Sequence, residues 1–94
     1  MQLFAVRRPG VWAKFDEVSV AASRSAHIGD RDMADRIRWI RSYVIEEANQ
    51  RIGSLCIYLA EDEAAIREHA KRVGMAGNMI VPIVDTIVVR PDPQ

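Results

Sequence analysis

Two segments with strand-like composition lie close together in the middle of the chain. Residues 37–47 and 52–60 are rich in β-branched and aromatic side chains, and the short polar sequence 48–51 between them suits a hairpin loop. This spacing predicts a long antiparallel hairpin. Because such a sheet buries at least one of its faces, the rest of the chain has to supply the cover.

Helices are predicted on both sides of this hairpin. Between residues 15 and 31, apolar and small side chains recur every three or four positions, as on one face of a helix. A second helix is expected to begin after Asp62, a residue type that favours N-caps, and to end at Gly74, because glycine often terminates helices. A first strand over residues 3–8 and a last strand over residues 80–89 complete the order β-α-β-β-α-β.

This order predicts an α+β, ferredoxin-like fold, in which two helices cover one face of a four-stranded antiparallel sheet. A chain of 94 residues is too short for two independent cores, so residues 1–94 are predicted to form a single domain. We find no internal repeat beyond the two β-α-β halves.

Composition argues against several classes of partner. Lysine plus arginine and aspartate plus glutamate both number 13, so the charge balance does not favour nucleic acid or an anionic membrane surface, and the Arg7-Arg8 pair is interpreted as solvated surface. No apolar run approaches the roughly 20 residues of a membrane span. Cys56 is the single cysteine, which excludes a disulfide within the chain. With no recognisable signal peptide, a cytoplasmic location is predicted.

Alternation along the strands predicts what each face of the sheet carries. In residues 52–60 the aliphatic side chains of Leu55, Ile57 and Leu59 are expected to face the helices, which leaves Cys56 and Tyr58 on the open face. In residues 37–47, Ile40 and Val44 are the expected helix-facing pair. The side chains of that strand predicted on the open face are Trp39, Arg41, Tyr43 and Ile45.

A face with so many large side chains is too apolar to stay in water. Uncovered, it would expose several hundred Å² of apolar surface, more than a typical monomer tolerates. A second copy of the chain is the simplest cover, since two such sheets can pack face to face around a two-fold axis. We therefore expect a homodimer with a barrel-like interior.

Several segments together resemble a known family: RWIRSYV, LCIY, IREHAKRVGM and DTIVVRPDP. From about Met1 to Pro93, the chain is similar to a family of small, mostly uncharacterised bacterial proteins with a dimeric, ferredoxin-like α/β-barrel fold, some of which bind nickel. The resemblance implies a divalent transition metal such as nickel as ligand. Cys56 and His69 match the cysteine and the helix histidine of relatives and are the candidate metal ligands. Many relatives carry histidine where Arg41 stands, in the pattern W-x-H-S-Y, so this chain lacks that potential ligand.

Each candidate ligand also has a structural interpretation. Cys56 is either a soft metal ligand or reactive thiol, or a small buried hydrophobic residue. His69 is either a ligand or proton carrier near the sheet, or a half-buried helix residue bonded to a carbonyl group.

The aromatic neighbours of Arg41 suggest a binding role. A guanidinium between Trp39 and Tyr43 can stack on rings and hold a carboxylate, which belongs either to a ligand or to the protein itself, at Asp85 or Glu46. The tyrosine hydroxyls either orient a ligand or merely accompany cross-strand packing. The predicted ligand-binding residues are Trp39, Arg41, Tyr43 and Tyr58.

Three functions follow from these features. The first is a small homodimer that binds a ligand such as nickel. The second is a cofactor-independent oxygenase or isomerase acting on a small aromatic or acidic compound, with His69 or a tyrosine moving protons. The third is a structural dimer without a ligand. Because the chain has no HExxH, CxxC, GxSxG or glycine-rich phosphate loop, no catalytic residue is predicted.

Overall fold

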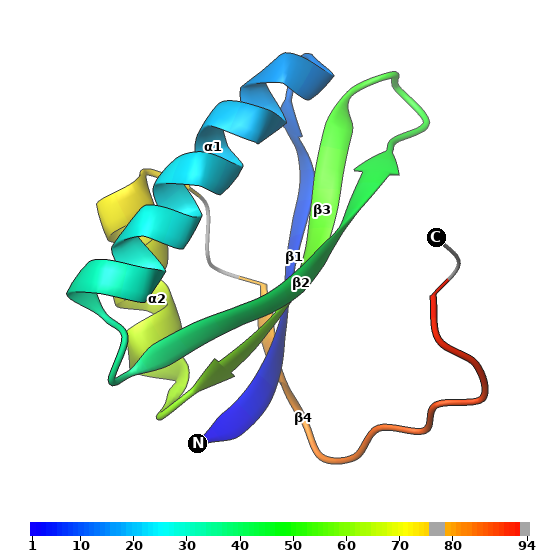
Figure 1. Cartoon of the computed structure of the whole chain (residues 1–94). Coiled ribbons are helices and arrows are strands. Elements are labelled where there is room, and N and C mark those ends of the chain that lie inside the picture. The colour runs from blue at the N-terminus through cyan, green and yellow to red at the C-terminus, as the bar shows by residue number, and fades with distance from the viewer. Residues whose placement is uncertain (76–78, 93–94) are drawn as a thin grey trace.

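The computed structural model describes residues 1–75 and 79–92 of the chain (Figure 1). The elements follow the predicted order. They are β1 (Gln2–Trp12), α1 (Phe15–His27), a π-helical turn η1 (Ile28–Asp32), β2 (Ile37–Glu46), β3 (Ile52–Ala60), α2 (Glu63–Val73) and β4 (Ile80–Ile83). No helix in this described part has both the length and the apolarity needed to cross a membrane.

The strands form one antiparallel sheet in the order β2-β3-β1-β4, and both helices lie against the same face of it (Figure 1). This arrangement confirms the predicted α+β, ferredoxin-like fold. The sheet of one chain is open, with β2 and β4 at its edges. The last strand was predicted too long, because β4 ends at Ile83 and residues 84–89 pair with no strand of the described chain.

Local sequence determines the ends of α2. The Asp62 side chain accepts a hydrogen bond of 2.8 Å from the Ala65 amide, which satisfies one of the free donors of the first turn. Gly74 ends the helix in the left-handed region with φ of 82°, where a side chain would be strained. Both ends confirm the sequence-based prediction.

The core lies between the helices and the sheet. Its members are apolar residues of the strands, α2 and the loop after η1: Phe4, Val6, Met33, Ile37, Cys56, Tyr58, Ala60, Ala65 and Ile66. Val18 and Ser25 are the buried residues of α1, which agrees with the predicted stripe of small side chains.

The predicted orientation of β3 is wrong. Ser54, Cys56 and Tyr58 are buried under the helices, whereas Leu55, Ile57 and Leu59 face the open side and are only half-buried. The prediction assumed that the most aliphatic row faces the helices. The helix-facing row instead tolerates polar groups because they bond to one another there, and the aliphatic row remains on the open face.

A bulge makes the prediction for β2 half right. Trp39 pairs with Tyr58 and Arg41 with Ile57, so Ile40 is an extra residue opposite the regular β3. The bulge places Trp39 on the helix-facing side, where it packs against the core, and Ile40 on the open face, so both were predicted on the wrong side. Val44 faces the helices, as predicted. Arg41 and Tyr43 stay on the open face, as predicted.

Candidate functional site

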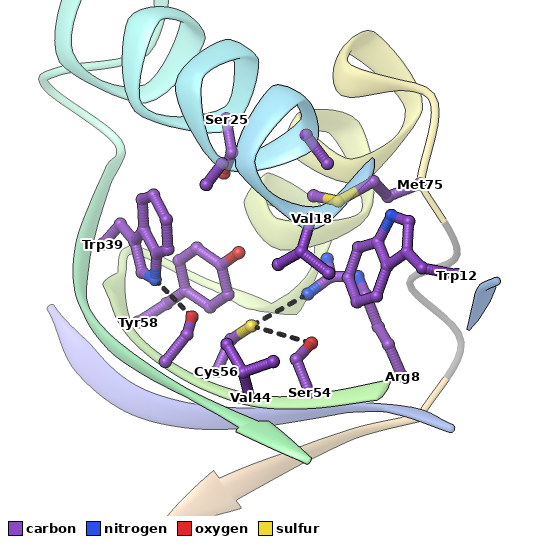
Figure 2. A pocket seen from close by; sticks show the side chains of 13 residues that line it. Arg8, Trp12, Val18, Ser25, Trp39, Val44, Ser54, Cys56, Tyr58 and Met75 are labelled. Atoms are coloured by element: carbon purple, nitrogen blue, oxygen red, sulfur yellow. Dashed lines mark hydrogen bonds between the residues drawn. The ribbon is translucent and has the colours of Figure 1, made fainter. Parts of the chain in front are cut away.

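A pocket of about 200 Å³ lies between α1 and the helix-facing side of the sheet (Figure 2). Trp12 and Trp39 stand on opposite sides of it, and α1 forms its roof. The remaining lining residues come from all three long strands, α1 and the segment just after α2: Arg8, Val18, Ala21, Ala22, Ser25, Ser42, Val44, Ser54, Cys56, Tyr58 and Met75. The pocket therefore contains three of the predicted site residues, Trp39, Cys56 and Tyr58.

A buried arginine and a thiol meet at the floor of this pocket. Arg8 is only 1% exposed, and its Nη1 donates to the Cys56 sulfur at 3.3 Å. Ser54 Oγ lies 3.4 Å from the same sulfur (Figure 2). Cys56 is thus not a purely apolar filler, because its sulfur is held between a guanidinium and a hydroxyl group.

Tyr58 adds a hydroxyl group to the same cluster. Its side chain is almost completely buried, and this burial raises the pKa of the phenol, with the neighbouring Cys56 adding to the effect. Interactions with Arg8 and Ser25 act in the opposite direction. Tyr58 therefore remains a neutral phenol at physiological pH and can donate or accept a hydrogen bond.

His69 lies behind Tyr58, outside the pocket lining. Its ring meets that of Tyr58 edge-on at 5.6 Å, and Nε2 lies 2.9 Å from the Ser25 carbonyl oxygen. Because a carbonyl only accepts, Nε2 carries the proton and ties α2 to α1. Of the interpretations left open by the sequence, the bond to a carbonyl is the one observed.

The protonation of His69 should make the fold sensitive to acid. Burial, aided by the nearby Arg8 charge, lowers the pKa of this imidazole below its unfolded value of about 6.5, so the unfolded state takes up the proton first. Stability contributed by neutral His69 is complete above about pH 6.5 and is lost as the pH falls toward the folded pKa. We expect His69 to contribute a loss of up to about 1.4 kcal/mol per pH unit in that window.

Urea unfolding at fixed protein concentration between about pH 7.5 and 5 tests this expectation. His69→Gln keeps a donor for the Ser25 carbonyl and should flatten the pH dependence of the free energy of unfolding. His27→Gln, at the exposed histidine, is the matched control and should retain the wild-type dependence. Equal pH dependence in all three proteins would contradict the assignment.

Within the described part of the chain, Cys56 and His69 do not belong to a cluster of metal-ligating side chains. The Cys56 sulfur already accepts from the cationic Arg8, and His69 Nε2 is bonded to Ser25. Over residues 1–75 and 79–92, no three histidine, cysteine or acidic side chains come close enough together to hold an ion. The donors that the structure describes in a single chain therefore do not fit a nickel ion, which needs several ligands of this kind.

Arg41 and Tyr43, the other two predicted site residues, lie on the opposite, open face of the sheet. Asp92 Oδ2 accepts a 2.8 Å hydrogen bond from the Tyr43 hydroxyl and lies 3.3 Å from Arg41 Nη1. The protein itself thus supplies a carboxylate for Arg41, although neither Asp85 nor Glu46 provides it. The six predicted site residues fall into two groups separated by the sheet.

The sequence-based interpretation missed Arg8, which was assigned to the solvated surface. The sequence did contain a signal for its burial. Phe4, Val6 and Arg8 lie two residues apart and therefore share one face of a strand, and Phe4 and Val6 are plainly core residues. Arg7, on the other face, pairs instead with Glu47 at 2.5 Å. Trp12 was left in a loop, but β1 extends through it to close one side of the pocket.

Comparisons place the chain among known proteins. A sequence profile of the family described as "Nickel responsive protein SCO4226-like" matches residues 5–83. The crystal structure of SCO4226 from Streptomyces coelicolor A3(2) superposes with a TM-score of 0.72, covering 90% of this chain and 99% of that one at 10% sequence identity. At such low identity the likeness concerns the fold alone. A comparison with curated protein sequences finds no match.

Proposed function

This chain belongs to the family of SCO4226-like nickel responsive proteins, and we propose that it is a homodimer that binds a small aromatic molecule carrying an anionic group. The binding site that we assign is the pocket between α1 and the sheet. One observation carries this proposal: Arg8, Cys56 and Tyr58 converge, almost fully buried, at the floor of a pocket with apolar walls. Ligand sites commonly combine such walls with a few well-placed polar groups.

The walls of the pocket favour an aromatic ligand of modest size. A volume of about 200 Å³ accommodates one or two fused rings, and the indole rings of Trp12 and Trp39 offer flat apolar surfaces on either side. Among the described residues that line the pocket, Arg8 is the one with a charge, and none carries a carboxylate. The electrostatics of the pocket therefore favour an acceptor or anionic group directed at Arg8.

Titration with two matched probes tests this site. We expect 2-naphthoate to bind with a Kd below about 1 mM and the neutral 2-naphthamide to bind at least about tenfold more weakly, measured by calorimetry. Ala22→Phe places a ring in the pocket and should weaken naphthoate binding by more than about tenfold. Ser23→Phe adds the same ring on the exposed side of α1 and should leave binding unchanged.

Two results would count against the site. One is that no small aromatic carboxylate binds more tightly than about 10 mM. The other is that Ala22→Phe binds as well as Ser23→Phe, which would mean that the ligand occupies another part of the protein.

In the proposed homodimer, the open faces of the two subunits cover each other. This face carries apolar side chains from all four strands: Leu3, Ala5, Ile40, Tyr43, Leu55, Ile57, Leu59, Val81 and Ile83. Neither helix covers it (Figure 1). Two such faces packed together around a two-fold axis would close the open sheets into a barrel-like dimer.

Nickel is the second candidate ligand, because the family is described as nickel responsive. Since the donors of one chain do not fit this ion, binding would require further donors, and a site shared between two subunits would double the supply. Titration of untagged protein tests this candidate, and less than about one tenth of an equivalent of bound nickel per chain would reject it. The cytoplasmic location and the enzymatic alternative stay predictions.

A further inference from the structure

We propose that the tail segment, residues 84–92, is exchanged between the two subunits, so that Asp92 of each chain bonds to Arg41 and Tyr43 of the partner subunit. This inference rests on the homodimer proposed above. It assigns to the tail segment a role that neither the family description nor the fold comparison contains.

The tail segment exposes most of its apolar side chains to water. Val84, Ile87, Val88 and Val89 are 93%, 87%, 71% and 80% exposed. Four β-branched side chains in water expose roughly several hundred Å² of apolar surface, which is near the limit that a monomer normally leaves uncovered. Such residues favour a strand that is paired and packed, yet pairing of this part of the chain ends at Ile83.

A groove lies beneath the tail segment. This segment forms an arch that stands away from the open face (orange to red in Figure 1) and encloses a groove of about 880 Å³. Leu3, Ile40 and Ile57 line the groove on the sheet side, and Ile87 and Val89 line it on the tail side. The groove is open to solvent, so its apolar lining stays in contact with water unless a partner chain covers it.

The two ends of the arch lie at opposite edges of the sheet. The arch leaves the sheet at β4, one edge, and its Asp92 reaches Arg41 and Tyr43 on β2, the opposite edge. Both edge strands offer unpaired backbone groups, which favour addition of a further strand. In a two-fold dimer, the segment from β4 of one subunit can reach β2 of the other and make the same Asp92 contacts, as in other exchanged elements. Exchange also covers the apolar tail residues, which the contact within one chain leaves in water.

Charge reversal distinguishes exchange from a contact within one chain. Arg41→Asp and Asp92→Arg each place like charges at both contacts of a dimer, and each should raise the dimer dissociation constant about tenfold at low salt. When the two variants are mixed, exchange restores both contacts of the heterodimer. The introduced aspartate of one chain meets the introduced arginine of the other at the first contact, and the unchanged Arg41 and Asp92 meet at the second.

Native mass spectrometry of the mixture should show heterodimer in clear excess, with wild-type affinity by sedimentation. The double variant R41D/D92R is the control, because its charges match in either arrangement.

The possible outcomes are distinct. A mixture close to the statistical ratio of about 1:2:1, with no gain in affinity, would show that Asp92 bonds within its own chain and would overturn the exchange while leaving the homodimer intact. A wild-type protein that stays monomeric at high concentration would overturn the homodimer and the exchange with it.

Discussion

Tyr58→Ala is expected to lower the free energy of unfolding by about 3–5 kcal/mol, a large share of the total stability of a domain of this size. Tyr58 is 1% exposed and lies at the centre of the helix-facing side of the sheet, beside Trp39 and against the ring of His69. Its removal would leave a cavity that the regular strand cannot collapse to fill. It would also remove the phenol from the polar cluster around Arg8.

Tyr58→Phe separates these two effects. It keeps the ring and removes only the hydroxyl group, so the expected loss is about 1 kcal/mol. Urea unfolding followed by circular dichroism, at one protein concentration, measures both variants. If Tyr58→Ala cost less than about 1 kcal/mol, the ring would not be the central packing element that its burial indicates.

Gly53→Ala is the second substitution expected to lower the free energy of unfolding strongly, because a side chain at this position of β3 would collide with its neighbours. A methyl group at this position would lie 2.5 Å from the Arg8 carbonyl oxygen and 2.8 Å from the Gly10 nitrogen, and it would also meet Glu47 Oε1. Two of these atoms belong to the backbone of β1, where pairing with β3 shifts register between Arg8 and Trp12. We expect a loss of about 2–3 kcal/mol, because the strands have to separate.

Gly74→Ala is the matched control for this substitution. Its φ of 82° disfavours a side chain, but the nearest atom that a methyl group would meet is Arg24 Nη1 at 3.8 Å. Only backbone strain applies there, and the expected cost is about 1 kcal/mol. Equal losses for the two variants in urea unfolding would show that crowding at Gly53 relaxes freely. Because Gly53→Ala presses on the Arg8 carbonyl, it should also weaken binding in the pocket.

Local patterns predicted the elements well because each depends on residues that are near one another in the chain. Asp62 and Gly74 define α2 through a side-chain cap and a left-handed turn, which are both short-range effects. β3 agrees with its predicted bounds, and β2 differs by one residue at its end. The β-α-β-β-α-β order then leaves few topologies, so the fold class followed from the elements.

The faces of the strands were harder to predict, because a single extra residue reverses them. The bulge at Ile40 depends on how β2 pairs with β3, and it moves Trp39 to the helix-facing side while Arg41 and Tyr43 stay on the other. For β3, hydrophobicity alone favoured the wrong row. Hydrophobicity could not predict that Cys56 and Tyr58 would find polar partners in Arg8 and Ser25, which come from distant parts of the chain.

By itself, the sequence determined most of the elements and their order, since propensity, capping and alternation act over a few residues. Only the tertiary structure decided which side chains share a site. Arg8, Cys56 and Tyr58 meet because three strand registers and the packing of α1 bring their side chains to one place. Asp92 reaches Arg41 across the width of the sheet for the same kind of reason. Such contacts depend on distances between segments far apart in the chain, and no local pattern encodes them.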